Sequence, residues 1–306
     1  MVTFALRRLL WLLPMLLAVS LVSFMMVHLV PGDPVEILMG QTATGSSLQL
    51  QRHELGLDQP LPVQYARYVG NALRGDLGTS IRSGRPVMRE IADRVPATLE
   101  LTLAAMAVAI ALGVGVGTLA AAARARWLSG LALLLSTFGL SLPTFWLGLL
   151  LIDLFALNLR WFHVIGDTTP RGTVLPTVTL ALPAAAVLAR VTYAGLVEVL
   201  HQDYIRTAQA KGLARGRVVL VHALRNAVIV VLTIAGLQFG NLLAGSVIVE
   251  RVFSRPGLGY FVVDAILNRD YPDIQGTVLV FAVLYVVINL VLDVLYGVIN
   301  PRIRLS

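Results

Sequence analysis

The segment from Asp203 to Asn226 is the longest polar and basic interruption in the second half of a very apolar chain. Its charged residues are Asp203, Arg206, Lys211, Arg215, Arg217 and Arg225. Apolar and small residues recur in it at helical spacing, at Ile205, Ala208, Gly212 and Leu213. The pattern predicts a short amphipathic helix, a turn at 213–216, and a second helix that returns to an apolar segment. Such a segment could bind a soluble partner through ion pairs and through close packing of its helix.

Motifs for catalysis or cofactor binding are missing. The sequence has no GxxxxGK[ST], HExxH or GxSxG, no pair of acids inside an apolar run, and 0 Cys. The five His are scattered without ligand spacing, at positions 28, 53, 163, 201 and 222, and are interpreted as loop or interfacial residues. We therefore expect no metal site, no cofactor held by this chain and no enzyme activity. An intramembrane enzyme and a membrane scaffold are the alternative function classes.

The composition predicts an integral membrane protein. Of 306 residues 57% are hydrophobic and 13% are charged, against roughly 25% charged in soluble domains. Six apolar runs are long enough for a bilayer core of about 30 Å: Leu9–Val30, Leu101–Ala123, Trp127–Ile152, Gly172–Ala189, Asn226–Val249 and Ile274–Ile299. The first run is too long for a signal-peptide core and is expected to stay uncleaved. The fourth should continue past Arg190 to Val197. The predicted fold class is all-α and polytopic, with six transmembrane helices.

Basic residues set the orientation. With the N-terminus inside, the inner segments carry 12 basic and three acidic residues, while the outer segments carry 12 basic and 14 acidic ones. Short cytosolic loops are enriched in Arg and Lys, so both termini and the 203–226 segment are predicted to be cytosolic. The basic residues are divided among short loops and make no continuous stripe, which excludes nucleic acid as a partner.

The outer segment between the first two runs is long enough to fold. It opens with PGDP, its residues Val63–Leu73 have the spacing of an amphipathic helix, and Arg74–Arg85 is typical of tight loops. The RGD at 74–76 is too short to indicate adhesion. The predicted organisation is an N-terminal transmembrane helix (1–30), an extracytoplasmic helical insertion (31–97), a core of five helices (98–299) with the cytosolic loop 198–225, and a cytosolic tail (300–306).

Polar residues inside the apolar runs have two interpretations. Gln238, Asn241 and Gly245 lie at i, i+3 and i+7 of the fifth run, and Ser141 and Thr144 flank a proline break in the third. Each group either packs helices together or lines a substrate path.

Two charged residues, Asp293 inside the sixth apolar run and Arg190 directly after the fourth, are also open to two interpretations. Asp293 is interpreted as a snorkelling or capping residue near Arg302, with a proton relay as the alternative. Arg190 is interpreted as an interfacial anchor, with a gate as the alternative.

Motifs along almost the whole chain resemble the permease subunits of binding-protein-dependent ABC importers, in the dipeptide/oligopeptide/nickel branch. They include DYIRTAQAKGL…HALRNA at the 203–226 segment, LGLDQPLPVQYARYVG at Leu55–Gly70, GDLGTSIRSGRPV at Gly75–Val87, GLQFGNLLAGSVIVERVFSRPGLG at Gly236–Gly259, RDYPDIQG at Arg269–Gly276 and NLVLDVLYGVINPRIR at Asn289–Arg304. The wider superfamily has E-A-A-x-x-x-G in its cytosolic loop. With that Gly aligned on Gly212, Arg206 stands where the superfamily has Glu.

The resemblance implies the ABC type I importer permease fold in a bacterial or archaeal cytoplasmic (inner) membrane. It implies a second homologous permease, two ATP-binding subunits that hold ATP and Mg, and an extracytoplasmic substrate-binding protein. It makes the 203–226 segment the helix that couples to an ATPase, through Asp203, Tyr204, Arg206, Thr207, Ala208, Lys211, Gly212 and Leu213. Ala208 and Gly212, at i and i+4, would share the face that approaches the partner. The expected cargo is a di- or oligopeptide, with glutathione, nickel or a metal chelate as the alternative.

Overall fold

The computed structural model describes residues 2–29, 53, 58–123, 125–162 and 169–299. Within these residues the chain is helical, and the one β feature is an isolated bridge between Thr79 and Pro86. The all-α prediction is confirmed. The elements are α1 (Val2–Leu29), α4 (Leu61–Leu73), α5 (Val87–Ala92), α6 (Val95–Ala122), α7 (Arg126–Ser141), α8 (Thr144–Leu151), the π-helical η2 (Ile152–Asn158), α9 (Pro170–Leu200), α10 (Asp203–Ala210), α11 (Arg215–Arg217), the π-helical η3 (Val218–Ala223), α12 (Leu224–Val252), α13 (Leu258–Asn268) and α14 (Tyr271–Ile299).

Four helical stretches among the described residues are long and apolar enough to cross a membrane: Val87–Ala122, Pro170–Leu200, Val230–Val252 and Tyr271–Leu292. The pair Trp127–Ser141 and Thr144–Asn158 makes a fifth if it is counted as one span. In the first predicted run, the described apolar stretch Leu13–Met26 is shorter than a full span. A count of six therefore stays a prediction. The expected continuation of the fourth run past Arg190 is confirmed, because α9 is unbroken to Leu200.

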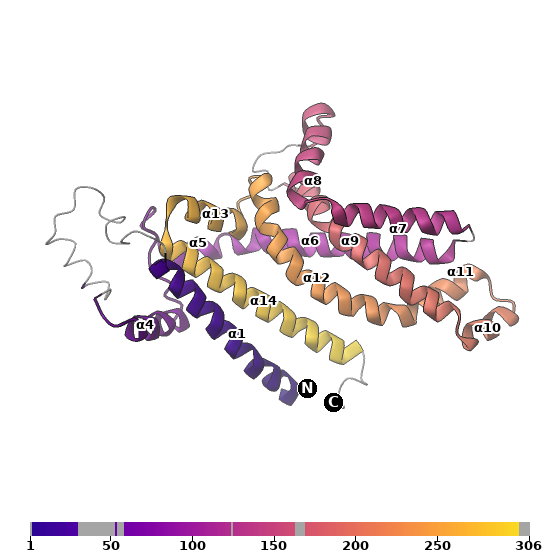
Figure 1. The fold of residues 1–306 in the computed structure, drawn as a ribbon, viewed down its shortest axis with the longest axis horizontal. Coiled ribbons are helices and arrows are strands. Elements are labelled where there is room, and N and C mark those ends of the chain that lie inside the picture. The colour runs from indigo at the N-terminus through magenta and orange to yellow at the C-terminus, as the bar shows by residue number, and fades with distance from the viewer. Residues whose placement is uncertain (1, 30–52, 54–57, 124, 163–168, 300–306) are drawn as a thin grey trace. The chain divides into compact units, whose positions relative to one another are not determined.

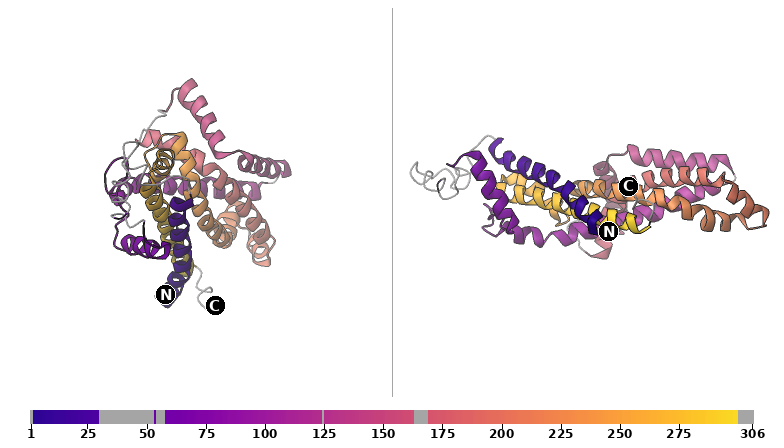
Figure 2. Two further views of the ribbon diagram at one scale, coloured as in Figure 1. Left: turned by 60° about the vertical axis from the view of Figure 1, so that its left-hand side comes forward. Right: turned by 90° about the horizontal axis from the view of Figure 1, so that it is seen from below.

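The chain divides into two compact units, which we describe separately: residues 1–96 with 261–290, and residues 97–260 with 291–306. In the first unit, the hydroxyl of Ser23 on α1 donates to the carbonyl of Gln275 on α14 (3.2 Å), and the side-chain amide of Gln275 donates to the carbonyl of Ser23 (3.3 Å). These reciprocal bonds hold α1 beside α14 (Figures 1 and 2).

The predicted amphipathic helix at Val63–Leu73 is confirmed as α4, but a different face of it packs. Tyr65 and Tyr68 lie against Phe24 of α1, with ring centroids 5.5 Å and 5.9 Å apart. Of the apolar residues spaced along one side of α4, Val63, Ala66 and Leu73 are exposed, whereas Val69 and Ala72 are partly buried. The two aromatic rings bury more area than the small apolar side chains and decide which face docks.

In the second unit, α6 lies directly against α9. A Cβ on Gly113 would be 2.5 Å from Leu188 Cβ, and one on Gly117 would be 2.5 Å from the carbonyl oxygen of Ala189. These two glycines, four residues apart on one face of α6, allow the backbones to approach closely, as small residues do in membrane helices. The views of Figures 1 and 2 agree that α6, α7 and α9 run side by side.

The third predicted run, Trp127–Ile152, is not one straight span. It is divided into α7 and α8, which are bent by 101° at Leu142–Pro143 (Figure 1). Leu142 is extended, with φ −81° and ψ 125°, as the residue before a proline prefers. The predicted proline break is confirmed.

Candidate functional site

The 203–226 segment folds as a short helix held between two long ones. After α9 ends, Gln202 is extended (φ −77°, ψ 150°), and α10 starts at Asp203. Asp203 lies in the first turn of α10, where its negative charge faces the positive end of the helix dipole. The chain then returns through α11 and η3 into α12 (Figure 1). The predicted order of helix, turn and returning helix is confirmed.

The inner face of α10 is anchored by an apolar cluster, which we call the anchor cluster. Its buried members are Leu196, Val199, Ile205, Ala208, Val218, Ala223 and Ala227. Ile205 is fully buried, and Ala208 is 9% exposed. The cluster joins α10 to the end of α9 and to η3 and the start of α12, so a force on α10 reaches both long helices.

The position of Ala208 corrects the prediction that it shares a partner-facing surface with Gly212. Ala208 faces the chain's own anchor cluster, and Leu213 packs against the same cluster. Spacing of i and i+4 places two residues on one side of a segment only where the helix is continuous. Because α10 ends before Gly212, Ala208 packs inward whereas Gly212 is exposed and has nothing within 4 Å of an added Cβ.

Gly212 terminates α10. Its φ is +79°, a left-handed conformation that favours glycine. The amide of Gly212 donates to the carbonyl of Gln209 (2.9 Å), and that of Leu213 donates to the carbonyl of Ala208 (3.4 Å). This is the Schellman pattern, in which an apolar contact of the following residue closes the helix end.

The outer face of α10 exposes Asp203, Arg206, Thr207 and Lys211. Arg206 and Asp203 form an exposed i,i+3 pair at 3.7 Å, which contributes little because both groups remain solvated. Tyr204 is 40% exposed, and its hydroxyl accepts a hydrogen bond from the side-chain amide of Asn226 (2.6 Å). This surface offers charges of both signs.

The residues predicted to line a path are divided between two places. On α12 the amide of Asn241 donates to the side-chain oxygen of Gln238 (2.8 Å), and Asn241 is exposed. Gly245 lies against α9, where an added Cβ would be 3.0 Å from Leu180. This contact places Gly245 in helix packing.

The other two members of this set lie at the α7–α8 bend. The hydroxyl of Ser141 donates to the carbonyl of Thr137 in its own helix (3.1 Å), and Thr144 begins α8. For the two charged residues at the ends of apolar runs, Arg190 is exposed on α9. Arg302 and the side chain of Asp293 lie outside the described residues.

A buried polar network near the end of α12 was not singled out from the sequence. Glu250 is fully buried, and its carboxylate accepts from the hydroxyl of Thr98 (2.7 Å) and from the amides of Gly259 (2.7 Å) and Tyr260 (3.2 Å). The carboxylate at the end of α12 therefore caps the N-terminus of α13, the next helix in the chain. The sequence does contain a signal for this network, because Glu250 directly follows the fifth apolar run and is followed by SRPGLG at 254–259.

Arg255 completes this network. It is 1% exposed, and its guanidinium donates to the hydroxyl of Thr173 on α9 (2.9 Å) and to the carboxylate of Glu100 on α6 (2.8 Å). Together Glu250 and Arg255 join the ends of α6, α9 and α12.

Comparison with known proteins identifies the family. Residues 113–305 match the binding-protein-dependent transport system inner membrane component, and residues 1–102 match the N-terminal part of such membrane components. The chain is 48% identical over 304 residues to the glutathione transport system permease protein GsiC of Salmonella paratyphi A (strain ATCC 9150 / SARB42), and 47% identical over 304 residues to that of Escherichia coli (strain K12), covering 99% of both chains in each case.

Solved structures agree on the fold. The inward-facing MetNI methionine ABC transporter matches with a TM-score of 0.58 and 18% identity, over 70% of this chain and 97% of that chain. An amino acid ABC transporter with histidines matches with a TM-score of 0.51 and 18% identity, over 70% and 94%. These matches confirm the predicted ABC type I importer permease fold and the resemblance to the dipeptide/oligopeptide/nickel branch. The chain belongs to the family of inner membrane components of binding-protein-dependent transport systems, and it is a multi-pass permease subunit of an ABC importer.

Proposed function

We propose that this chain forms half of the translocation pathway for glutathione. The observation that carries the proposal is 48% identity over 99% of both chains to a glutathione permease. Glutathione is one of the alternative cargoes predicted from the sequence. Because it is a tripeptide, it is chemically close to the di- or oligopeptide that was the first expectation. A nickel cargo has less support, because no group of three or more metal-ligating side chains occurs among the described residues.

The proposed assembly contains a second homologous permease, two ATP-binding subunits and an extracytoplasmic binding protein. The sequence has no P-loop, so ATP and Mg would be held by the ATP-binding subunits. Basic residues gathered in the inner segments support cytosolic termini and a cytosolic α10.

In the proposed mechanism α10 receives the force of ATP hydrolysis. Its outer face, with Asp203, Arg206, Thr207 and Lys211, docks on an ATP-binding subunit. The anchor cluster then carries the displacement into α9 and α12, which move as rigid elements in an alternating-access cycle.

Labelled glutathione uptake by cells tests the cargo. Deletion of the gene for this chain should abolish saturable uptake, and a plasmid copy should restore it. Excess unlabelled dipeptide should compete weakly. If uptake of glutathione survives deletion while uptake of labelled dipeptide is lost, the cargo is a dipeptide and the proposal is wrong.

A further inference from the structure

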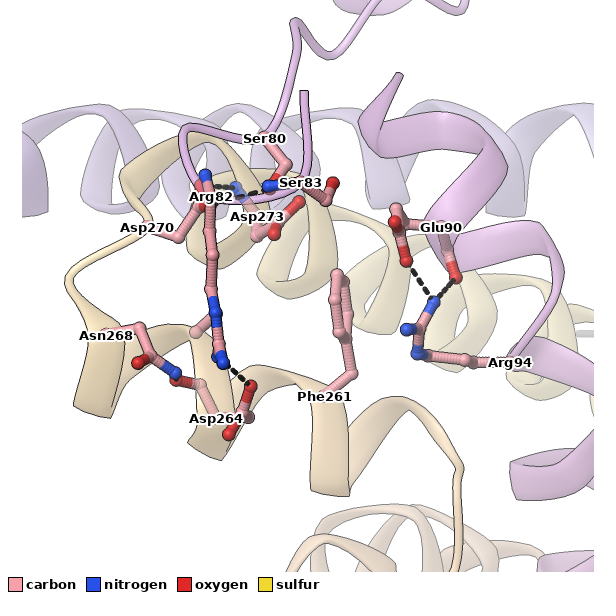
Figure 3. Close-up of a pocket in the computed structure, with 11 residues that line it drawn as sticks. Ser80, Arg82, Ser83, Glu90, Arg94, Phe261, Asp264, Asn268, Asp270 and Asp273 are labelled. Carbon is pink, nitrogen blue, oxygen red and sulfur yellow. Dashed lines mark hydrogen bonds and ion pairs between the residues drawn. The ribbon is translucent and has the colours of Figure 1, made fainter. Parts of the chain in front are cut away.

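A polar pocket lies within the first unit, far in sequence from the 203–226 segment. It has a volume of about 300 Å³ and is formed by the 80–94 region together with residues 261–273 (Figure 3). Both regions belong to segments that the charge distribution assigns to the outer side of the membrane, where a cargo arrives.

The two arginines of this pocket already have acidic partners. Arg82 pairs with Asp264 at 3.2 Å, and Arg94 pairs with Glu90 at 2.6 Å. Arg94 also lies over the ring of Phe261, 4.2 Å from its centroid. Neither guanidinium is therefore directed at the remaining two carboxylates (Figure 3).

Those remaining carboxylates, Asp270 and Asp273, form no ion pair with either arginine of the described pocket. Asp270 is 2% exposed and accepts only from neutral donors: the hydroxyl of Ser80 (2.7 Å) and the amide of Arg82 (2.9 Å) through one oxygen, and the amide of Asp273 (3.4 Å) through the other. Four carboxylates and two arginines line the pocket, and Arg85, outside the lining, also pairs with Glu90 (3.2 Å), so the pocket keeps a net negative charge.

Asp273 supplies the feature that points to a ligand. It is 5% exposed, it lines the pocket, and its Oδ1 has no hydrogen-bond partner within the described part of the chain. A buried polar atom without a partner is rare and needs an explanation, since leaving it unpaired is unfavourable. A positively charged group placed in the pocket would offset the charges of Asp270 and Asp273.

The geometry favours an organic ammonium over a metal ion. No group of three or more acidic, His or Cys side chains is arranged to hold a metal among the described residues. A primary ammonium has three donors and needs acceptors on one side only. We propose that this pocket binds the primary ammonium group of a peptide-like cargo before the cargo enters the membrane. The identity of the cargo rests on the proposed function, whereas binding of an amine does not.

Glycinamide, which has one ammonium group and no carboxylate, is the probe. Its binding to the purified transporter complex in nanodiscs, measured by calorimetry, should be saturable, and N-acetylglycinamide should bind at least tenfold more weakly. Asp273→Asn and Asp270→Asn should each weaken glycinamide binding at least tenfold. Asp93→Asn is the matched control, because Asp93 is exposed in the same unit, pairs with Arg85, and does not line the pocket. Thermal midpoints establish that each variant is folded.

Three results would overturn the inference: no glycinamide binding to the wild type, equal binding of the acetylated probe, or unchanged binding to folded Asp273→Asn. Displacement of glycinamide by cargo-free binding protein would show that a partner's lysine fills the pocket, and would overturn the assignment to cargo. If the complex imports glutathione but does not bind glycinamide, the pocket assignment is wrong and the proposed function stands. If the complex binds glycinamide but does not import glutathione, the proposed function is wrong and the pocket assignment stands.

Discussion

Glu250 and Arg255 are buried charges in the same unit that are stabilised in different ways. Arg255 forms an ion pair with Glu100, whose side chain is 57% exposed. Glu250 accepts hydrogen bonds from neutral groups, two of which are amides at the positive end of α13. Asp293 drew attention in the sequence because it lies inside an apolar run. Glu250 did not, because burial of a residue at the end of a run depends on helices distant in sequence.

Glu250→Gln should destabilise the protein. A glutamine has only one side-chain acceptor oxygen, and its amide would meet the N–H groups of Gly259 or Tyr260. We expect a loss of about 1–3 kcal/mol from the unsatisfied groups. The thermal midpoint of the purified complex measures it, with Glu198→Gln, an exposed change on α9, as the control. Equal midpoints for the two variants would contradict the buried capping role.

Gly212→Ala tests the Schellman end of α10. An added Cβ meets nothing within 4 Å, so the cost comes from the φ of +79° alone, about 1–2 kcal/mol for a residue with a Cβ. We expect faster hydrogen exchange in α10 while the rest of the chain is unaffected. Gly216→Ala is the control, since that site is also open and its φ is not positive. The same exchange rates in both variants would show that Gly212 is not needed to end the helix.

At the scale of elements, apolar runs predict where the helices lie but not how they pack. The runs of the second half correspond to α9, α12 and α14. The proline break was visible in the sequence, yet the 101° between α7 and α8 depends on packing that no local pattern contains. Ala208 shows the same limit, because helical spacing cannot decide whether a face meets a partner or the chain's own anchor cluster.

Gly113→Ala and Gly117→Ala should each loosen the contact between α6 and α9. Each new methyl group would overlap Leu188 Cβ or the carbonyl of Ala189, at 2.5 Å, and overpacking typically costs about 1–3 kcal/mol. Gly115→Ala is the control, because that site has nothing within 4 Å and alanine favours the helix. Thermal midpoints should fall for the first two variants only. A fall for Gly115→Ala as well would indicate a general intolerance of α6 to alanine.

For the whole molecule, large exposed apolar side chains such as Leu119, Leu134 and Leu237 are consistent with a surface that lipid or a partner subunit covers. Composition and charge were enough to predict a membrane protein. They were not enough for the cargo. The proposed glutathione cargo rests on relatives compared over the full length.

Arg206→Glu should separate ATP hydrolysis from transport. Arg206 is exposed and weakly paired with Asp203, so folding should be unaffected. A reversed charge on the proposed docking face should lower the glutathione imported per ATP hydrolysed severalfold. Arg171→Glu is the control, being exposed at the opposite end of α9. Equal coupling ratios for both variants would show that α10 does not dock through this residue.

The most direct test of the account is glutathione uptake by the complete complex reconstituted in proteoliposomes. Labelled glutathione should accumulate only when this chain, its partner permease, the ATP-binding subunits, the binding protein and ATP-Mg are all present. Accumulation should stop when ATP is replaced by a non-hydrolysable analogue. Uptake that needs neither ATP nor this chain, or ATP-driven uptake of a different solute with none of glutathione, would contradict the account.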